Sequence, residues 1–500
     1  MAAKLTLGWV VNNALAPTYW LDPRSRAGAQ SPADLVTLDA AEIGGHTAVV
    51  AQSGSGKSFF LGRLIEEILL ATRARCVVLD PNADFRRVHE ALEARVWPTA
   101  CYDHRRGLGR LPHEPSRSHF LRDWTRISKR VYVGPGAAGR AYTPLRLTWH
   151  LLSPEILAEA IQAVQRPQIY HCHAFVGVLA ELLGDSESRR STDLLDRAEQ
   201  LLASPAARGA AGPELGLDVE EIARRMASAH RDRLRQHEPE GRSRAPVPPL
   251  GRLRRHYLAH VRAQLQRARV ARRYITAEMA SYYFAKAREY HAERIFAPTG
   301  LHRSPRFRPR LEVYDLPSVP TESMRLLAVN SVLAAQWNEV RGDWADAVER
   351  PRDEDYRVPT FIIVDEAHNL MPREPPSTAH GTVRQIFRTI AAEGRKYGLF
   401  LILVTQRPDK IDPLVLSECQ SAAILRLGSA ATLHLTQTLL GVEDVPQTTL
   451  GKCLEFQAGR ALLVGDWVKH QPTLLFTAVR RTLEGGGGLR SSYWAVSGLP

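Results

Sequence analysis

Continuous apolar runs alternate with amphipathic stretches in two separate parts of the chain. In the first part, His46–Ala51 and Cys76–Asp80 have the uninterrupted apolar pattern of buried strands. Phe59–Thr72, which lies between them, has apolar residues at three- and four-residue spacing, and this spacing predicts a helix. Because strands buried on both faces are typical of parallel sheets covered by helices, the pattern predicts an α/β fold.

The same alternation returns after residue 305. The predicted strands are Arg310–Leu316, Thr360–His368, Leu399–Gln406 and Ala422–Leu427, and the predicted helices are Glu322–Arg341 and Thr382–Tyr397. Between the two parts, helical patterns begin at a Ser153-Pro154 cap and no strand is predicted. The expected fold is therefore an α/β core with a mostly parallel sheet, interrupted by an all-helical insertion. The expected domains are an N-terminal segment (1–45), the two core halves (46–150 and 306–480), the insertion (151–305) and a C-terminal tail (481–500).

The net charge and the cysteines indicate which kind of partner and which cellular compartment to expect. The formal net charge is +13 and the pI is about 9.7, which favours a polyanionic partner. An arginine-biased genome would explain the preference for Arg over Lys, but not the excess of basic over acidic residues. Five scattered cysteines without a C-x-x-C pair favour a reducing compartment. No signal peptide is evident, and no stretch approaches the ~20 apolar residues of a membrane helix, so we expect a cytoplasmic protein.

The segment Ala51–Ser58, AQSGSGKS, lies between a predicted strand and a predicted helix. This is the context of a phosphate-binding loop, although Ala51 stands where the motif has its first glycine. The backbone N–H groups expected to surround the phosphates belong to Ser53, Gly54, Ser55 and Gly56. Lys57 is expected to reach the β- and γ-phosphates, and the Ser58 hydroxyl to ligate Mg²⁺. The sequence thus predicts an ATP and Mg²⁺ site.

Three further residues at strand ends complete the expected chemistry. Asp365 follows an apolar strand and is expected to hold Mg²⁺, and the adjacent Glu366 to deprotonate the attacking water. Gln406 ends another strand, where its neutral amide can sense the γ-phosphate or the water. Acidic pairs and glutamines also cap helices and loops. These assignments therefore depend on the presence of the phosphate loop in the same chain.

Basic residues outside the loop have two interpretations. Arg395 lies at a predicted helix end, where a cation stabilises the helix dipole, but it could also act as an arginine finger on a neighbouring subunit. Arg480 and Arg481, in the tail, are candidates for a similar role at the nucleotide.

Several motifs occur together in an informative order: VVAQSGSGKS, VLDPNADF, FIIVDEAHNLMP, the block from Glu393 to Leu427, and RRTLEGG. Together they resemble the HerA family of hexameric DNA-translocating ATPases, which belongs to the FtsK-HerA group. The resemblance implies a RecA-like core, a ring in which Arg395 acts in trans, and a place for Asp80 beside the nucleotide. The usual N-terminal β-barrel of about a hundred residues is not expected, since only about 45 residues precede the loop.

The predicted insertion contains a strongly basic segment. Residues 231–273 hold thirteen arginines and three acidic residues. Phosphate contact with DNA is one interpretation, and a solvated basic helix is the other. The arginines proposed to contact DNA are Arg252, Arg254, Arg255, Arg269, Arg272 and Arg273.

The predicted function is a ring-shaped, Mg-ATP-hydrolysing DNA translocase or helicase. The family resemblance implies a separately encoded nuclease or effector partner in DNA processing or antiphage defence. Two alternatives remain open at this point: a conjugation- or secretion-type motor that acts on protein, and an ATP-binding oligomeric scaffold without motor activity.

Overall fold

The computed structural model describes residues 3–11, 35–94, 97, 115–134, 137, 141–147, 152–160, 172–173, 176, 217–218, 274–275, 277–292, 308–348 and 357–485. The chain divides into two compact units. The first, here called the sheet unit, comprises Met1–Thr143, Pro305–Pro320 and Gln336–Pro500. The second comprises Pro144–Ser304 and Thr321–Ala335.

A twelve-stranded sheet organises the fold, with the strand order β2-β1-β14-β13-β12-β3-β11-β10-β4-β9-β5-β6. In chain order its strands are β1 (Lys4–Val10), β2 (Leu35–Asp39), β3 (Thr47–Val50), β4 (Arg75–Asp80), β5 (Lys129–Val133), β6 (Thr143–Pro144), β9 (Leu311–Asp315), β10 (Thr360–Val364), β11 (Leu399–Thr405), β12 (Ser421–Ile424), β13 (Arg460–Gly465) and β14 (Thr473–Thr477). The strands from β12 to β5 are parallel to their neighbours, and those from β12 to β2 on the other side are antiparallel.

The two distant parts of the sequence interleave within the parallel region. β10 lies between β4 and β11, with Val364 in register with Leu79 on one side and with Leu403 on the other. The carboxyl ends of these strands therefore meet at one edge of the sheet, called here the carboxyl edge, where ligands bind in open α/β sheets. The predicted α/β class with a mostly parallel sheet is confirmed.

The antiparallel flank is absent from the predicted elements, as is β5. β1 pairs with both β2 and β14, so the N-terminal segment and the end of the chain join the same sheet. Both strands of the predicted N-terminal segment (1–45) that the structure describes therefore belong to this sheet. In β1, the alternating residues Leu5, Leu7 and Trp9 are fully buried.

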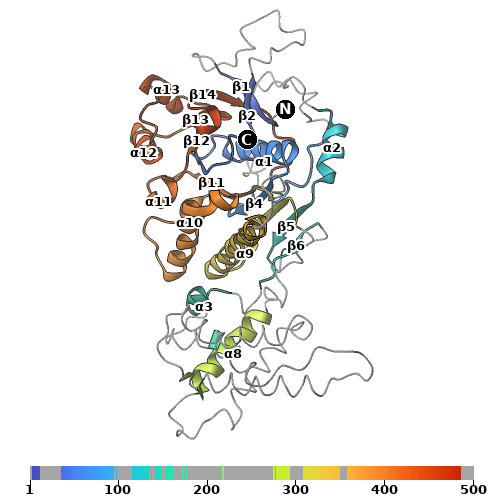
Figure 1. The fold of residues 1–500 in the computed structure, drawn as a ribbon, viewed down its shortest axis with the longest axis vertical. Coiled ribbons are helices and arrows are strands. Elements are labelled where there is room, and N and C mark those ends of the chain that lie inside the picture. Colours follow the sequence, from blue (N-terminus) through green and yellow to red (C-terminus); the bar gives the residue numbers. More distant parts are fainter. Residues whose placement is uncertain are drawn as a thin grey trace, which may run out of the picture. The chain divides into compact units, whose positions relative to one another are not determined.

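Helices cover both faces of the sheet. α1 (Lys57–Ala71) and α2 (Arg117–Arg126) contribute Phe60, Leu64 and Trp124 to a core cluster with strand residues such as Val78. α10 (Thr378–Tyr397) packs along β11, and its Tyr397 contacts Trp344 of α9 (Glu322–Val348). In Figure 1, β11 and β4 are drawn between α1 and α10. The remaining short helices of the sheet unit are η7 (Leu316–Ser318), η9 (Ala367–Asn369), α11 (Pro413–Leu416), α12 (Ala430–Leu440), α13 (Gln447–Gly451), η10 (Lys452–Leu454) and η11 (Asp466–Val468).

The second unit contains α3 (Pro154–Ala160) and α8 (Ala277–Ala292). His173 is buried there. Its Nε2 donates a hydrogen bond to the Leu152 carbonyl, and its Nδ1 is hydrogen-bonded to the Tyr283 hydroxyl, each at 2.9 Å. The prediction of an all-helical insertion is wrong in one respect, because β7 (Leu217–Asp218) and β8 (Tyr274–Ile275) form an antiparallel pair. Two residues per strand are too few to produce the alternating pattern by which strands are predicted.

Within the described part of the chain, no helix combines the length and apolar character needed to span a membrane.

Candidate nucleotide site

The phosphate loop connects β3 to α1 at the carboxyl edge of the sheet. Gly54 and Gly56 both have left-handed backbone angles, with φ values of 72° and 92°. A Cβ atom on Gly56 would lie 2.8 Å from the backbone nitrogen of Gly459, so no side chain fits there. α1 begins at Lys57 and has no acidic residue in its first turn. The loop therefore presents successive N–H groups and a positive helix end, as an anion requires.

Lys57 faces the two carboxylates that follow β10. Its ammonium lies 2.8 Å from Asp365 Oδ1 and also pairs with Glu366 Oε1. Burial alone would lower the pKa of Lys57, but the attraction of Asp365 and Glu366 outweighs burial and raises the pKa above its ordinary value. Lys57 is thus held as a cation between the phosphate loop and the acidic pair.

Glu366 is the centre of the site. Its backbone is left-handed (φ 43°, ψ 49°), which costs about 1–3 kcal/mol for a residue with a side chain. Gln406, at the end of β11, donates its amide hydrogen to Glu366 Oε1. Glu366 Oε2 is buried and has no hydrogen-bond partner among the described residues. Three elements thus converge on one strained carboxylate that keeps an acceptor atom available.

His368 is a neighbour of this carboxylate that sequence reasoning misses. Its Nδ1 lies 3.6 Å from Glu366 Oε2 and 3.2 Å from the Thr405 hydroxyl. Burial lowers the pKa of His368, although the Glu366 charge opposes this. A neutral imidazole beside Glu366 leaves the carboxylate's charge uncompensated on that side.

Comparison with known proteins bears on the predicted resemblance. Residues 28–231 match the family described as "Helicase HerA, central domain", and residues 322–427 match the AAA family of ATPases associated with various cellular activities. This part of the chain is therefore similar to a HerA central domain. The predicted resemblance to the HerA family is confirmed.

The individual relatives of the chain are distant. It is 38% identical over 114 residues to "DNA double-strand break repair helicase HerA" of Sulfurisphaera tokodaii, which covers 23% of this chain and 22% of the relative. The protein of the same name from Pyrococcus furiosus is 31% identical over 111 residues, 22% of this chain and 19% of the relative. The chain thus matches about a fifth of the length of these relatives. Among solved structures, VirB4 of Thermoanaerobacter pseudethanolicus aligns over 95% of this chain and 96% of its own, at 15% identity and a TM-score of 0.42.

Asp80, predicted beside the nucleotide, is buried at the end of β4 and stabilises the turn that follows this strand. Its carboxylate accepts hydrogen bonds from the backbone N–H groups of Asn82, Asp84 and Phe85 at 2.8–3.2 Å. Burial raises the pKa of Asp80 to about 7, although these hydrogen bonds oppose the shift. The side chains of its neighbours in the turn lie at the site instead. Sequence reasoning does not predict these neighbours.

Asn82 and Asp84 are these neighbours. Asn82 Nδ2 donates to Asp365 Oδ2 at 3.3 Å, and the Ser58 hydroxyl donates to Asp84 Oδ2 at 2.7 Å. The turn therefore contacts both residues predicted to ligate Mg²⁺.

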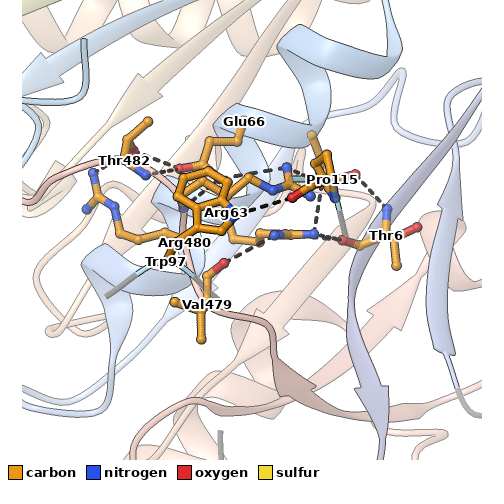
Figure 2. Close-up of polar contacts among 10 residues, drawn as sticks. Thr6, Arg63, Glu66, Trp97, Pro115, Val479, Arg480 and Thr482 are labelled. Atoms are coloured by element: carbon orange, nitrogen blue, oxygen red, sulfur yellow. Dashed lines mark hydrogen bonds and ion pairs between the residues drawn. The ribbon is translucent and has the colours of Figure 1, made fainter. Parts of the chain in front are cut away.

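Arg480 and Arg481 are buried within the chain, against α1 (Figure 2). Arg480 Nη1 donates to the Ser58 carbonyl at 3.4 Å, and its guanidinium passes so close to Gly62 that a Cβ there would lie 2.7 Å from Nε. Arg481 Nη1 donates to Glu67 Oε1 at 3.0 Å. Both arginines thus join the segment after β14 to the phosphate-loop helix.

Arg395 is not brought to the site of its own chain. It is an exposed residue in the last turn of α10, which ends just before the amino end of β11. Lys57 and Glu366 lie at the carboxyl edge, so Arg395 lies at the opposite edge of the sheet. The six arginines predicted to contact DNA, from Arg252 to Arg273, lie outside the described residues.

The deviation at Ala51 is expected to have little effect. Ala51 is buried, and its N–H donates to the Thr405 carbonyl at 3.1 Å, before the left-handed part of the loop. Replacing Ala51 with glycine should keep kcat for ATP hydrolysis within about threefold, because a lost buried methyl costs only ~1 kcal/mol. Steady-state ATPase assays would measure this. A much larger change would indicate that the methyl sets the geometry of the loop.

Proposed function

We propose that the chain is a Mg-ATP-hydrolysing DNA translocase or helicase with a RecA-like core. The observation that carries the proposal is the convergence of Lys57, Glu366 and Gln406 from three separate strand ends onto one another. Hydrolysis of a γ-phosphate requires this combination of a cation, a base and a neutral polar group. The relationship to helicases named for DNA double-strand break repair supports DNA as the substrate.

The residues present fit ATP and Mg²⁺. Gly54 and Gly56 have left-handed backbone angles, which let successive N–H groups of the loop turn towards a phosphate. Ser55 Oγ is buried without a hydrogen-bond partner among the described residues. Ser58 and Asp365 are the proposed Mg²⁺ ligands. Bound Mg²⁺ would neutralise charge on the β- and γ-phosphates.

The proposed mechanism gives each of these three residues one role. Lys57 neutralises charge that develops on the transferring phosphoryl group. Glu366 accepts the proton of the attacking water at its available oxygen, Oε2. Gln406 holds Oε1 of the same carboxylate, which fixes the orientation of the base.

The ring is the second part of the proposal. Arg395 is exposed at the edge opposite its own phosphate loop, and this exposure supports a role at a neighbour's nucleotide in a homo-oligomer, which we propose to be a hexamer. Mixing Lys57→Ala subunits with Arg395→Ala subunits should recover ATPase activity that neither variant has alone, because some interfaces would pair an intact loop with an intact arginine. Mixtures that stay as inactive as their components would exclude action in trans.

DNA dependence is the test of the proposed function. ATP hydrolysis should rise several-fold with duplex DNA at low salt and lose this stimulation at high salt, since phosphate contacts release counterions. Rates with and without duplex at two salt concentrations would show this. If the rate does not respond to DNA, the proposed ATPase activity would still stand, but the proposed DNA translocase activity would be contradicted.

A separately encoded nuclease or effector is the partner we propose, in DNA processing or antiphage defence. Affinity purification of the tagged chain from its native cells, with mass spectrometry, would identify this partner. A chain that degrades DNA by itself would contradict the proposal.

A further inference from the structure

A cavity of about 330 Å³ lies at the amino ends of the parallel strands, away from the nucleotide site. Its lining residues are Arg73, Arg75, Arg308, Arg310 and Val358. Arg75 is the first residue of β4, Arg310 immediately precedes β9, and Val358 lies two residues before β10. We call this cavity the arginine pocket.

Two of its arginines are fixed by carboxylates on α9. Glu339 Oε1 lies 2.6 Å from Arg75 Nη1 and 2.7 Å from Arg308 Nε. Arg308 also pairs with Asp343 Oδ2 at 2.6 Å. These contacts hold both guanidinium groups in place, so this wall of the pocket is preorganised.

The other two arginines have no carboxylate partner among the described residues. Arg310 Nη2 donates to the carbonyls of Leu69, Thr72 and Ala74, at the end of α1. Arg73 is exposed and makes no hydrogen bond or ion pair within the described part of the chain. Backbone carbonyls supply partial charge only, so neither cation is fully neutralised.

The charge balance of the pocket is therefore positive. Its four guanidinium groups outnumber the three carboxylates that pair with Arg75 and Arg308, which are those of Glu339, Asp343 and Glu312, the last at 3.9 Å from Arg75 Nη2. An arginine pocket of this kind suits an oxyanion, because the planar guanidinium binds phosphate with two parallel hydrogen bonds. Val358, which is 39% exposed, adds an apolar surface at the rim.

We propose that the arginine pocket binds a phosphate group, with Arg73 as the residue that contacts it from the solvent side. The phosphate is either part of a nucleic-acid backbone or a free phosphate. The nucleic-acid source rests on the proposed function, whereas the free-phosphate source does not.

The pocket is separate from the nucleotide site. α1 runs from Lys57 at the loop to Ala71, just before the pocket, and its 15 residues span about 20 Å. β4 likewise begins at the pocket with Arg75 and ends at Asp80 in the site. Substitution of Arg73 should therefore leave ATP hydrolysis without DNA unchanged.

The experiment uses the full chain with Arg73→Glu, Arg73→Lys and a control, Arg126→Glu. Arg126 is an exposed arginine at the end of α2, 74% of whose side chain is accessible. Fluorescence anisotropy with a labelled duplex oligonucleotide, over a series of salt concentrations, measures the nucleic-acid arm. Calorimetric titration with inorganic phosphate, on protein saturated with ADP and Mg²⁺, measures the free-phosphate arm. Melting curves and size-exclusion chromatography verify folding and assembly.

Loss of duplex affinity by several-fold in Arg73→Glu, with a salt slope lower by about 1, would support the nucleic-acid source. Arg73→Lys should keep most of the affinity. Loss of phosphate binding with unchanged duplex affinity would support the free-phosphate source. A wild-type chain that hydrolyses ATP but binds no duplex would contradict the proposed DNA function. The titration with inorganic phosphate would then be the only test of whether the arginine pocket binds a phosphate group. The proposal is overturned if Arg73→Glu matches Arg126→Glu in both arms, if the wild-type binds neither ligand, or if binding is lost only together with assembly.

Discussion

Replacing Glu366 with glutamine should lower kcat for ATP hydrolysis by about 10²–10⁴-fold, the usual contribution of a general base. The amide keeps the size of the side chain and an oxygen that can face Gln406, but it cannot accept a proton from water. Glutamine also leaves the left-handed backbone at position 366 as strained as in the wild type, so the comparison isolates the carboxylate. Single-turnover hydrolysis gives the rate, and titration with a fluorescent ATP analogue gives the affinity.

Nucleotide affinity should be retained in this variant, because Lys57 and the loop remain. Glu393→Gln is the matched control, since it makes the same chemical change on the exposed surface of α10. Turnover of Glu366→Gln at the wild-type rate would remove Glu366 from the mechanism and favour an ATP-binding scaffold. A comparable loss in the control would show that the effect is not specific to the site.

The principal site residues are predictable from sequence because each follows a strong local pattern. Lys57 comes directly after a glycine-rich loop, and Asp365, Glu366 and Gln406 come directly after uninterrupted apolar strands. Parallel strands align their carboxyl ends, so separate local signals converge in space without further information. The contacts of Lys57 with both carboxylates follow this logic.

Residues that depend on tertiary geometry are not predictable in this way. Asn82 and Asp84 enter the site because Asp80 turns inward to bind their backbone, and no periodicity signals this reversal. His368 lies in the quoted motif, but its distance from Glu366 depends on the left-handed backbone of Glu366 itself.

The flanking strands are not predicted for a different reason. β1 has a short apolar alternation, but it pairs with β14, which lies more than 450 residues further along the chain. Pairing between strands so far apart cannot be predicted from a short stretch of the sequence. The burial of Arg480 and Arg481 follows from the same closure, because the segment after β14 is drawn against α1.

Replacing Glu66 with alanine should destabilise the sheet unit by about 3–5 kcal/mol, the cost of breaking a buried ion network. Glu66 Oε1 accepts hydrogen bonds from the N–H groups of Arg481 and Thr482, each at 2.9 Å, and from the Thr482 hydroxyl at 2.7 Å (Figure 2). Arg63 extends the network to the carbonyls of Thr6 in β1 and Val479 after β14. Alanine would leave these donors buried without an acceptor. The melting temperature should fall by roughly 5–8 °C.

Glu66→Gln separates the two sources of this cost. The amide keeps an acceptor for Thr482 but removes the negative charge that faces Arg63, Arg480 and Arg481, so its melting temperature should fall between those of wild type and Glu66→Ala. Burial raises the pKa of Glu66, while these arginines oppose the shift, and a glutamine equal in stability to wild type would mean that the carboxyl is protonated in the fold. Glu393→Ala serves as the exposed control and should shift the melting temperature by less than about 1 °C. If Glu66→Ala behaves like this control, the packing of the segment after β14 against the phosphate-loop helix does not depend on Glu66.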